Sequence, residues 1–296
     1  MTENHIVMTY NPSYLSLNTP IVSDQGNEFS GSSGNKNQNT KNEDNYKGRS
    51  FSEHSRRILK KRAQWFNYGT KYQYITSHKH NQIYKYKLAF ITLTLPAPQQ
   101  HTNNKIKSKL LNNYLTYLRK NHNLTNYIWK AELQKNGNIH FHIITDLKLP
   151  YQIHQNIWNM QCEALNYITR FEKKHGKRTP PSTNVKLIFN SKNLNYYIGK
   201  YFSKISEEDI IEGRHWSCSS NISKLDNKNL KFTLDEFMRL EELVIAGIIG
   251  YKSDLGFRIW FITSRQLSIY FPTVIDGQVK KIKKELVERL ALVQGE

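Results

Sequence analysis

Apolar residues in the middle of the chain alternate between strand-like and helix-like spacing. Leu88 to Leu95 is apolar on both faces and stops at Pro96, which is typical of a central strand. Tyr127 to Gln134 and Ile139 to Thr145 flank the turn-forming Lys135-Asn136-Gly137, so they predict a hairpin. Helical spacing follows the first strand in residues 103–120, and it follows the hairpin in a stretch that opens at Pro150.

The same alternation continues up to residue 222. Val185 to Phe189 predicts another strand, residues 193–205 a short helix, and Gly213 to Ser219 a last strand. The predicted order is therefore strand, helix, hairpin, helix, strand, helix, strand. Because a hairpin pairs its strands antiparallel, this order predicts an α+β fold with a mainly antiparallel sheet rather than a doubly wound one.

The two ends of the chain have different patterns. Residues 1–50 are rich in Asn, Ser, Gly and Thr, and we expect a disordered tail because so little apolar surface cannot offset the entropy of ordering. After residue 222 a small α/β extension is predicted, with helices over 233–249 and 278–293 and a hairpin of strands 257–263 and 266–271. The resulting division has four parts: a polar tail (1–50), a basic aromatic arm (51–86), a central domain (87–222) and an extension of unknown role (223–296).

Composition indicates the kind of partner. The net charge is +19, from 43 basic and 24 acidic residues, and such an excess favours a polyanion. The chain also has 18 Tyr, 13 Phe and 5 Trp, and aromatic rings are what single-stranded nucleic-acid surfaces use for stacking.

Much of this chemistry is concentrated in the arm. Ser52 predicts the N-cap of a basic helix, and Glu53 is the one acid between residues 52 and 87. The alternatives are a solvated helix face, a nuclear-import patch at Arg56 to Arg62, or contact with nucleic acid. The candidate DNA-binding residues are Arg56, Arg57, Lys60, Lys61, Arg62, Lys85 and Lys87, which precede or interleave with Tyr72, Tyr74, Tyr84 and Tyr86.

Several protein classes are excluded or disfavoured. Cys162 and Cys218 lie far apart, which excludes a zinc-finger framework and favours a reducing compartment. No run of about 18 apolar residues predicts a membrane span, and no secretory signal pattern opens the chain, so we expect a cytoplasmic protein. The sequence has no P-loop, no dinucleotide-binding glycine motif and no nucleophile elbow.

One candidate metal site lies in the predicted hairpin. In a strand, His140 and His142 share a face, and Glu132 lies on the neighbouring strand with Gln134 on the same face as an alternate. A pair of histidines two apart is more often a surface or core feature than a ligand pair. Two imidazoles and a carboxylate, however, suit Mg²⁺, Mn²⁺ or Zn²⁺ with positions left open, and no fourth ligand is evident for a closed zinc site.

A second motif runs from Asn195 to Lys204. On a helix Tyr197 lies directly below Tyr201, and Lys200 and Lys204 each follow a tyrosine by three. The same spacing describes a buried aromatic stripe. A phenol, with an ordinary pKa near 10, becomes a useful nucleophile where a metal neutralises the phosphate and a lysine stabilises the developing charge.

Together these motifs resemble the HUH endonucleases, specifically the replication initiators of rolling-circle plasmids and of single-stranded DNA phages and viruses. Phe90-Ile-Thr-Leu-Thr is similar to motif I, Glu132 with Gly137-Asn-Ile-His140-Phe-His142 to motif II, and Tyr197-Ile-Gly-Lys200-Tyr201-Phe-Ser-Lys204 to motif III. Arg214-His-Trp-Ser resembles a strand that follows the tyrosine helix in many initiators, which adds Arg214 to the DNA-binding candidates. The resemblance covers about residues 86–222.

The resemblance implies a ferredoxin- or RRM-like antiparallel sheet with flanking helices. It implies that Glu132 (or Gln134), His140 and His142 bind Mg²⁺ or Mn²⁺. Tyr197 or Tyr201 would attack a phosphodiester of single-stranded DNA and leave a 5′-phosphotyrosine, with Lys200 and Lys204 steadying the phosphate or the phenolate. The implied partners are the origin hairpin and a host helicase and polymerase. The implied compartment is the bacterial cytoplasm for a phage or plasmid protein and the nucleus for a eukaryotic virus.

Two other readings stay open. An HUH-class transposase or relaxase would use the same chemistry, and flanking DNA would separate it from an initiator. A non-catalytic single-stranded nucleic-acid binder would use the charge and the aromatic rings as a stacking groove, with the motifs as core.

Overall fold

The computed structural model describes residues 5–18, 50–77, 82–189, 197, 200, 210–254 and 257–292. The chain divides into two units, and each unit combines segments that are far apart in the sequence. One unit takes Met1–Tyr46 and Asn227–Ile282, and the other takes Lys47–Asp226 and Lys283–Glu296. The boundaries expected at residues 50, 86 and 222 remain predictions.

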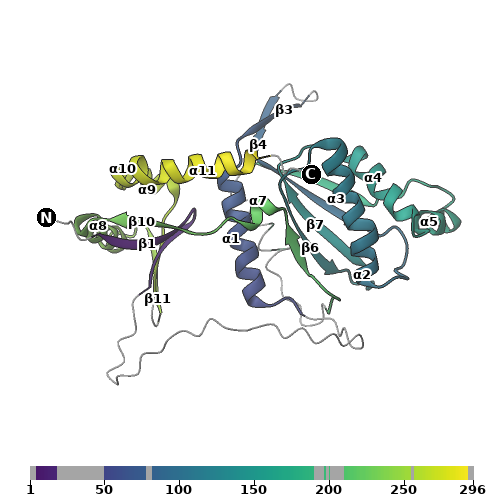
Figure 1. Ribbon diagram of the computed structural model, residues 1–296, viewed down its shortest axis with the longest axis horizontal. Coiled ribbons are helices and arrows are strands. Elements are labelled where there is room, and N and C mark those ends of the chain that lie inside the picture. The colour runs from purple at the N-terminus through teal and green to yellow at the C-terminus, as the bar shows by residue number, and fades with distance from the viewer. Residues whose placement is uncertain are drawn as a thin grey trace, which may run out of the picture. The chain divides into compact units, whose positions relative to one another are not determined.

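The central unit is built on a five-stranded antiparallel sheet with the order β8-β5-β7-β6-β9 (Figure 1). The predicted α+β class is therefore confirmed. Its strands are β5 (Leu88–Thr94), β6 (Tyr127–Leu133), β7 (Ile139–Thr145), β8 (Thr183–Ile188) and β9 (Trp216–Cys218). The turn between β6 and β7 places Gly137 at a φ of 81°, a left-handed conformation that glycine adopts readily.

One face of this sheet is covered by helices. Ile91, Phe141 and Trp129 point into the main hydrophobic core together with Tyr114 and Trp158 from the helices. The next residue of each strand points to the other face, which is where the polar residues lie. The helices are α2 (Asn103–Ile106), the π-helical turn η1 (Lys107–Leu111), α3 (Asn112–His122), α4 (Tyr151–Glu163) and α5 (Tyr167–His175).

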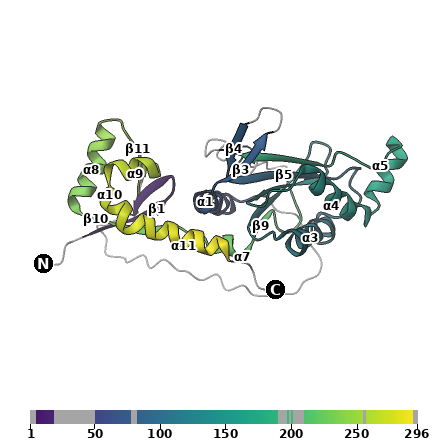
Figure 2. The same cartoon turned by 90° about the horizontal axis from the view of Figure 1, so that it is seen from above.

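The predicted basic arm forms a helix and a separate hairpin. Helix α1 (Glu53–Gly69) begins where expected, since the Ser52 side chain accepts a hydrogen bond from the Ser55 amide. Within the described residues, strands β3 (Gln73–Ser77) and β4 (Gln82–Tyr86) form a separate two-stranded sheet, which stands out from the main sheet in both views (Figures 1 and 2). Helices α7 (Ser220–Ser223) and the end of α11 (Lys280–Ala291) complete the unit.

Gly69 provides a test of how α1 packs on the end of α11. A Cβ built at Gly69 would lie 2.7 Å from Leu286 Cδ2 and 2.8 Å from Leu290 Cδ1, well inside van der Waals contact. We expect Gly69→Ala to lower the free energy of unfolding by about 1–3 kcal/mol, because overpacking forces side chains out of their preferred rotamers. Gly277→Ala is the matched control: that helical glycine has open space around it, so its alanine should be neutral or slightly stabilising. Equal urea-denaturation midpoints for the two variants would contradict the expected packing.

The second unit corrects the expectation of disorder near the N-terminus. Ile6–Asn11 (β1) and Tyr14–Asn18 (β2) form strands inside a five-stranded sheet of order β10-β1-β2-β12-β11. The run Ile-Val-Met-Thr-Tyr supplies apolar side chains that the average composition of residues 1–50 conceals, and Met8 and Tyr10 are fully buried. The remaining strands are β10 (Lys228–Phe232), β11 (Gly250–Asp254) and β12 (Phe257–Phe261).

The predicted hairpin of 257–263 with 266–271 is wrong in its second half. Residues Ser264–Tyr270 form helix α9, and β12 pairs with β11 and β2 instead. Thr263 and Gln266 make a capping box, which satisfies backbone N–H groups at the start of the helix. The other helices are α8 (Leu234–Ile245), α10 (Pro272–Val274) and the π-helical turn η3 (Ile275–Val279) that leads into α11.

Cys162 and Cys218 are both free thiols. Across the part of the chain that the structure describes, no helix is long and apolar enough to cross a membrane.

Candidate metal centre

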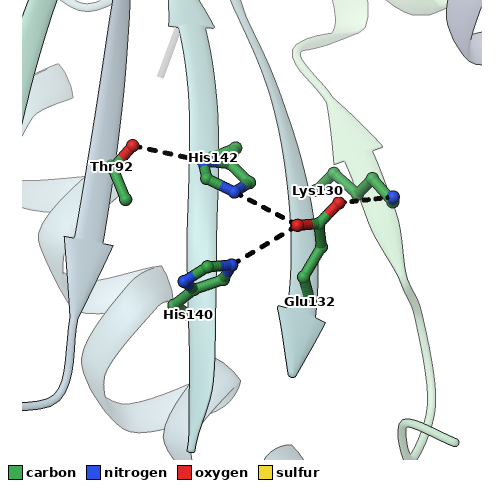
Figure 3. Close-up of polar contacts among 5 residues, drawn as sticks. All are labelled: Thr92, Lys130, Glu132, His140 and His142. Atoms are coloured by element: carbon green, nitrogen blue, oxygen red, sulfur yellow. Dashed lines mark hydrogen bonds and ion pairs between the residues drawn. The ribbon is translucent and has the colours of Figure 1, made fainter. Parts of the chain in front are cut away.

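The polar face of the central sheet brings together the three predicted ligands. Glu132 on β6 pairs directly with His140 on β7, and His142 pairs with Thr92 on β5. Opposite residues in an antiparallel pair point to the same face, so the carboxylate and both imidazoles gather on one side of the sheet. Figure 3 shows the two rings pointing toward the carboxylate of Glu132.

The ligand atoms are close enough for one ion. Glu132 Oε2 lies 3.4 Å from His140 Nε2 and 3.3 Å from His142 Nε2. One donor atom from each of the three residues lies within 4.8 Å of the others. The set is mostly shielded from solvent, since Glu132 and His142 are buried and His140 is half-buried.

The electrostatics favour the cation-binding forms of Glu132 and His142. Burial alone would raise the pKa of Glu132, but hydrogen bonds from His140 and His142 and the charge of Lys130 hold that pKa well below its usual range. Burial lowers the pKa of His142, although Glu132 acts in the opposite direction. An ionised carboxylate and a neutral imidazole are what a divalent metal requires of these residues.

Lys130 holds the other carboxylate oxygen. Its Nζ lies 2.8 Å from Glu132 Oε1, and its side chain is only 3% exposed. The Phe51 ring, just before α1, covers the same ammonium group at 4.8 Å and stacks on His215 with a centroid distance of 5.9 Å. Glu132 is therefore oriented with Oε1 on Lys130 and Oε2 toward the histidines (Figure 3).

Thr92 orients His142 from the other side. Its Oγ1 lies 3.2 Å from His142 Nδ1, on the side of the ring away from Glu132 (Figure 3). With an ion bound, Nδ1–H would donate to the threonine oxygen, and the Nε2 lone pair, no longer engaged as a donor to Glu132, would be free to face the ion. Hydrogen bonds of this kind set the tautomer and the ring orientation of metal-binding histidines.

The residues present fit a divalent metal ion. Two imidazoles and one carboxylate on rigid neighbouring strands form a three-ligand set of the kind that leaves positions open for substrate. Among the described residues, no group forms a hydrogen bond with the buried Nδ1 of His140. Gln134, the alternate ligand, lies past the end of β6, and its backbone N–H donates to Asn138 in the turn.

Tyr197 lies beside this cluster. Its ring stacks on Phe90 with a centroid distance of 4.6 Å, and Phe90 stacks on His142 at 5.3 Å. One aromatic ring therefore separates the tyrosine from a metal-ligand candidate. Lys200 is exposed, whereas Tyr201 and Lys204 lie outside the described residues.

Most of the predicted DNA-binding residues on α1 are engaged within the protein. Arg56 and Arg57 pair with Glu53, and Lys61 Nζ lies 2.5 Å from Asp226 Oδ1. The Arg62 guanidinium lies 5.4 Å from the centre of the Trp216 ring on β9. Lys60 is exposed.

The other basic candidates are divided between internal contacts and solvent. Lys87 donates to the carbonyl of Asn67, and burial lowers its pKa to about 8, with the charges of Lys283 and Lys85 adding to the effect. Lys85 and Arg214 are exposed. The structure thus gives most of these cations a partner within the protein, whereas Lys60, Lys85 and Arg214 are exposed.

Three residues around the site were missed by sequence reasoning. The signal for Lys130 was available, since it precedes Glu132 by two and therefore shares its face. Phe90 could also have been placed from alternation, two residues before Thr92. Phe51 had no local signal, because it reaches Lys130 only through the packing of α1.

Comparisons with known proteins point in the same direction. A family model described as replication-associated protein, of the ORF2 type, matches residues 88–206. No curated protein and no solved structure gives a significant match to the chain. The matched segment contains Tyr197 and the strands that carry the candidate metal ligands, so the match supports a replication-associated role for this part of the chain.

Proposed function

We propose that this protein is a metal-dependent endonuclease that nicks and rejoins single-stranded DNA at a replication origin, and so initiates rolling-circle replication. The observation that carries the proposal is the stacked series His142, Phe90, Tyr197, in which one ring lies between a candidate nucleophile and a residue of the three-ligand cluster. The family match over residues 88–206 supports the replication role. The HUH endonuclease mechanism is the specific mechanism that we infer from the stacked series and the family match together.

In this proposal Glu132, His140 and His142 hold Mg²⁺ or Mn²⁺. When bound, the ion neutralises charge on the scissile phosphate, which lowers the barrier to attack by an anionic or phenolic oxygen. Lys130 keeps Glu132 ionised and pointed at the histidines, and Thr92 keeps His142 in the ligating tautomer.

The chain's own nucleophile is Tyr197 or Tyr201. Its phenolic oxygen forms a bond to phosphorus, and the bond from phosphorus to the 3′ oxygen breaks. The phenol loses its proton and the released 3′ oxygen takes one up, leaving a 5′-phosphotyrosine and a free 3′-OH. Lys200 and Lys204 would steady the phosphate or the phenolate, since an ammonium group favours the charged oxygen. The covalent link conserves the bond energy for rejoining.

A denaturing gel tests this function. The wild-type protein, mixed with hairpin-containing single-stranded DNA and Mn²⁺, should give a covalent adduct that migrates above the free protein. Tyr197→Phe combined with Tyr201→Phe should give none, and the two single variants identify the first nucleophile. An adduct that survives in the double variant would overturn the assignment of the tyrosines. Tight binding without cleavage of any origin-derived strand would instead support a non-catalytic binder.

The Thr92 hydroxyl gives a separate prediction about metal affinity. Thr92→Val should weaken Mn²⁺ binding by about 10- to 100-fold, because the His142 ring loses the group that sets its tautomer and orientation. Thr94→Val is the matched control, since Thr94 lies two residues along β5 and its hydroxyl donates to the Ser182 carbonyl instead. Isothermal titration calorimetry with Mn²⁺ measures both variants. Equal affinities in the two variants would show that the Thr92 contact does not matter for binding.

A further inference from the structure

The hairpin of β3 and β4 has one face that is open to solvent and carries both aromatic rings and a cation. Cross-strand partners Tyr74 and Lys85 share this face, as do Thr76 and Ile83. Tyr74 is 66% exposed. Tyr72 directly precedes β3, lies two residues before Tyr74 and so on the same side, and is 47% exposed. Both rings lie outside the main hydrophobic core, so they are available for contact with a partner.

The structure separates the four tyrosines that the sequence groups together. Tyr86 is buried, and its hydroxyl donates to Gln73. Tyr84 lies on the opposite face, where its ring is 6.0 Å from that of Phe189 at the end of β8. Only Tyr72 and Tyr74 therefore present their rings on the face that carries Lys85.

The charge on this face suits a polyanion. Lys85 Nζ lies 4.2 Å from the centre of the Tyr72 ring, and Lys87 Nζ lies 4.9 Å from it. Between Glu53 and Glu132 the sequence contains no acidic residue. A polyanion that approaches the hairpin therefore meets cations on this face and no carboxylate from the hairpin itself.

We propose that this face of the β3–β4 hairpin binds single-stranded DNA, with bases stacking on Tyr72 and Tyr74 and Lys85 contacting the phosphates. Stacking needs exposed π-faces, which a single strand can meet with any base and a paired duplex cannot. The inference rests on the proposed function, since the strand it binds is the strand that the metal centre would cut.

The test measures binding without cleavage. Fluorescence anisotropy of a labelled oligothymidylate reports affinity. EDTA in the buffer removes the divalent ion, so the proposed nicking reaction cannot occur. Tyr74→Ala should weaken binding by about 5- to 100-fold, and Tyr72→Ala with Tyr74→Ala should weaken it further, since each stacked base contributes separately. Tyr74→Phe keeps the ring and should bind as the wild type does.

A control and a salt series separate stacking from charge. Tyr151→Ala removes a comparably exposed tyrosine, 51% exposed, from the first turn of α4, and it should leave the affinity unchanged. Lys85→Gln should reduce the slope of log affinity against log salt by about 0.7, the value for one phosphate contact on a single strand. Circular dichroism of each variant checks that the fold is retained.

The outcomes distinguish this inference from the proposed function. Wild-type affinity in the double tyrosine variant would overturn the hairpin surface, even if that variant still formed the covalent adduct. Weakened binding in the double variant, with adduct formation restored at saturating DNA, would support both. Weakened binding in the double variant, with no adduct from any form of the protein, would support DNA binding by the hairpin and contradict the proposed nuclease function. A wild-type protein that binds oligouridylate but not oligothymidylate would reject DNA as the partner.

Discussion

Replacing both His140 and His142 by alanine should lower the rate of DNA cleavage at saturating Mn²⁺ by at least about 1,000-fold. The two substitutions remove two of the three ligand candidates and leave only Glu132, whose Oε2 both imidazoles face. A metal that neutralises a reacting phosphate contributes several kcal/mol, and each 1.36 kcal/mol is about tenfold in rate. Single-turnover cleavage of hairpin-containing DNA, followed on a denaturing gel, measures the effect.

Affinity for single-stranded DNA should be retained in the same variant. The histidines lie on the sheet face, whereas the exposed tyrosines and Lys85 lie on the separate β3–β4 hairpin. His175→Ala is the control, because that exposed histidine on α5 should affect neither cleavage nor binding. Cleavage that stays within a few-fold of wild type in the double histidine variant would exclude the cluster as the metal centre.

The buried pair of Tyr114 and His154 should make stability depend on pH. Tyr114 OH lies 2.7 Å from His154 Nδ1, and both side chains are fully buried. Burial, with a smaller effect from His122, lowers the pKa of His154 to about 4 from an ordinary value near 6.5. As the pH falls from 6.5 to 4, the unfolded chain takes up a proton that the folded protein does not. This group's contribution to the free energy of unfolding is therefore complete above pH 6.5, and about 3 kcal/mol is lost by pH 4.

Asp146 has the opposite effect on the free energy of unfolding over much of the same pH range. Burial raises its pKa to about 6, so the folded protein takes up this proton first as the pH falls, and that stabilises the fold. The difference between variants isolates His154. Urea denaturation at pH 7 and pH 4 should show that His154→Gln loses about 3 kcal/mol less than the wild type, and that Asp146→Asn loses more than the wild type. An identical pH dependence in wild type and His154→Gln would show that the imidazole is not held neutral.

Strand alternation was sufficient to predict that Glu132, His140 and His142 come together. Because side chains in a strand alternate with a period of two, the spacing of His140 and His142 and the turn before them put Glu132 within reach on the neighbouring strand. The structure adds the register, which pairs Glu132 directly with His140. Ser52 predicted the start of α1 for a similarly local reason, since its side chain accepts from an amide three residues on.

Long-range pairing was beyond the reach of such local signals. The sequence of Ile6–Asn11 does not indicate that this strand pairs with Lys228–Phe232, which lies more than 200 residues later. The misassigned strand 266–271 is a different kind of error, because the Thr263 and Gln266 capping box was present in the sequence and outweighs the β-propensity of the residues that follow. Phe51 over Lys130 depends on tertiary packing and has no sequence signature of its own.

The sheet of the second unit, built from segments far apart in the sequence, has a consequence for how the protein folds during synthesis. Strands β1 and β2 lie in the interior of that sheet, yet β10 and β12, their outer partners, are translated only after residue 227. At about 5–20 residues per second, β1 waits for roughly 10–40 s after it leaves the ribosome. Throughout that interval an apolar strand with unpaired edges is available to other chains. Chaperone dependence and aggregation at high expression should therefore arise from the first eighteen residues, and a slower translation rate through the middle of the gene should lower the yield of folded protein.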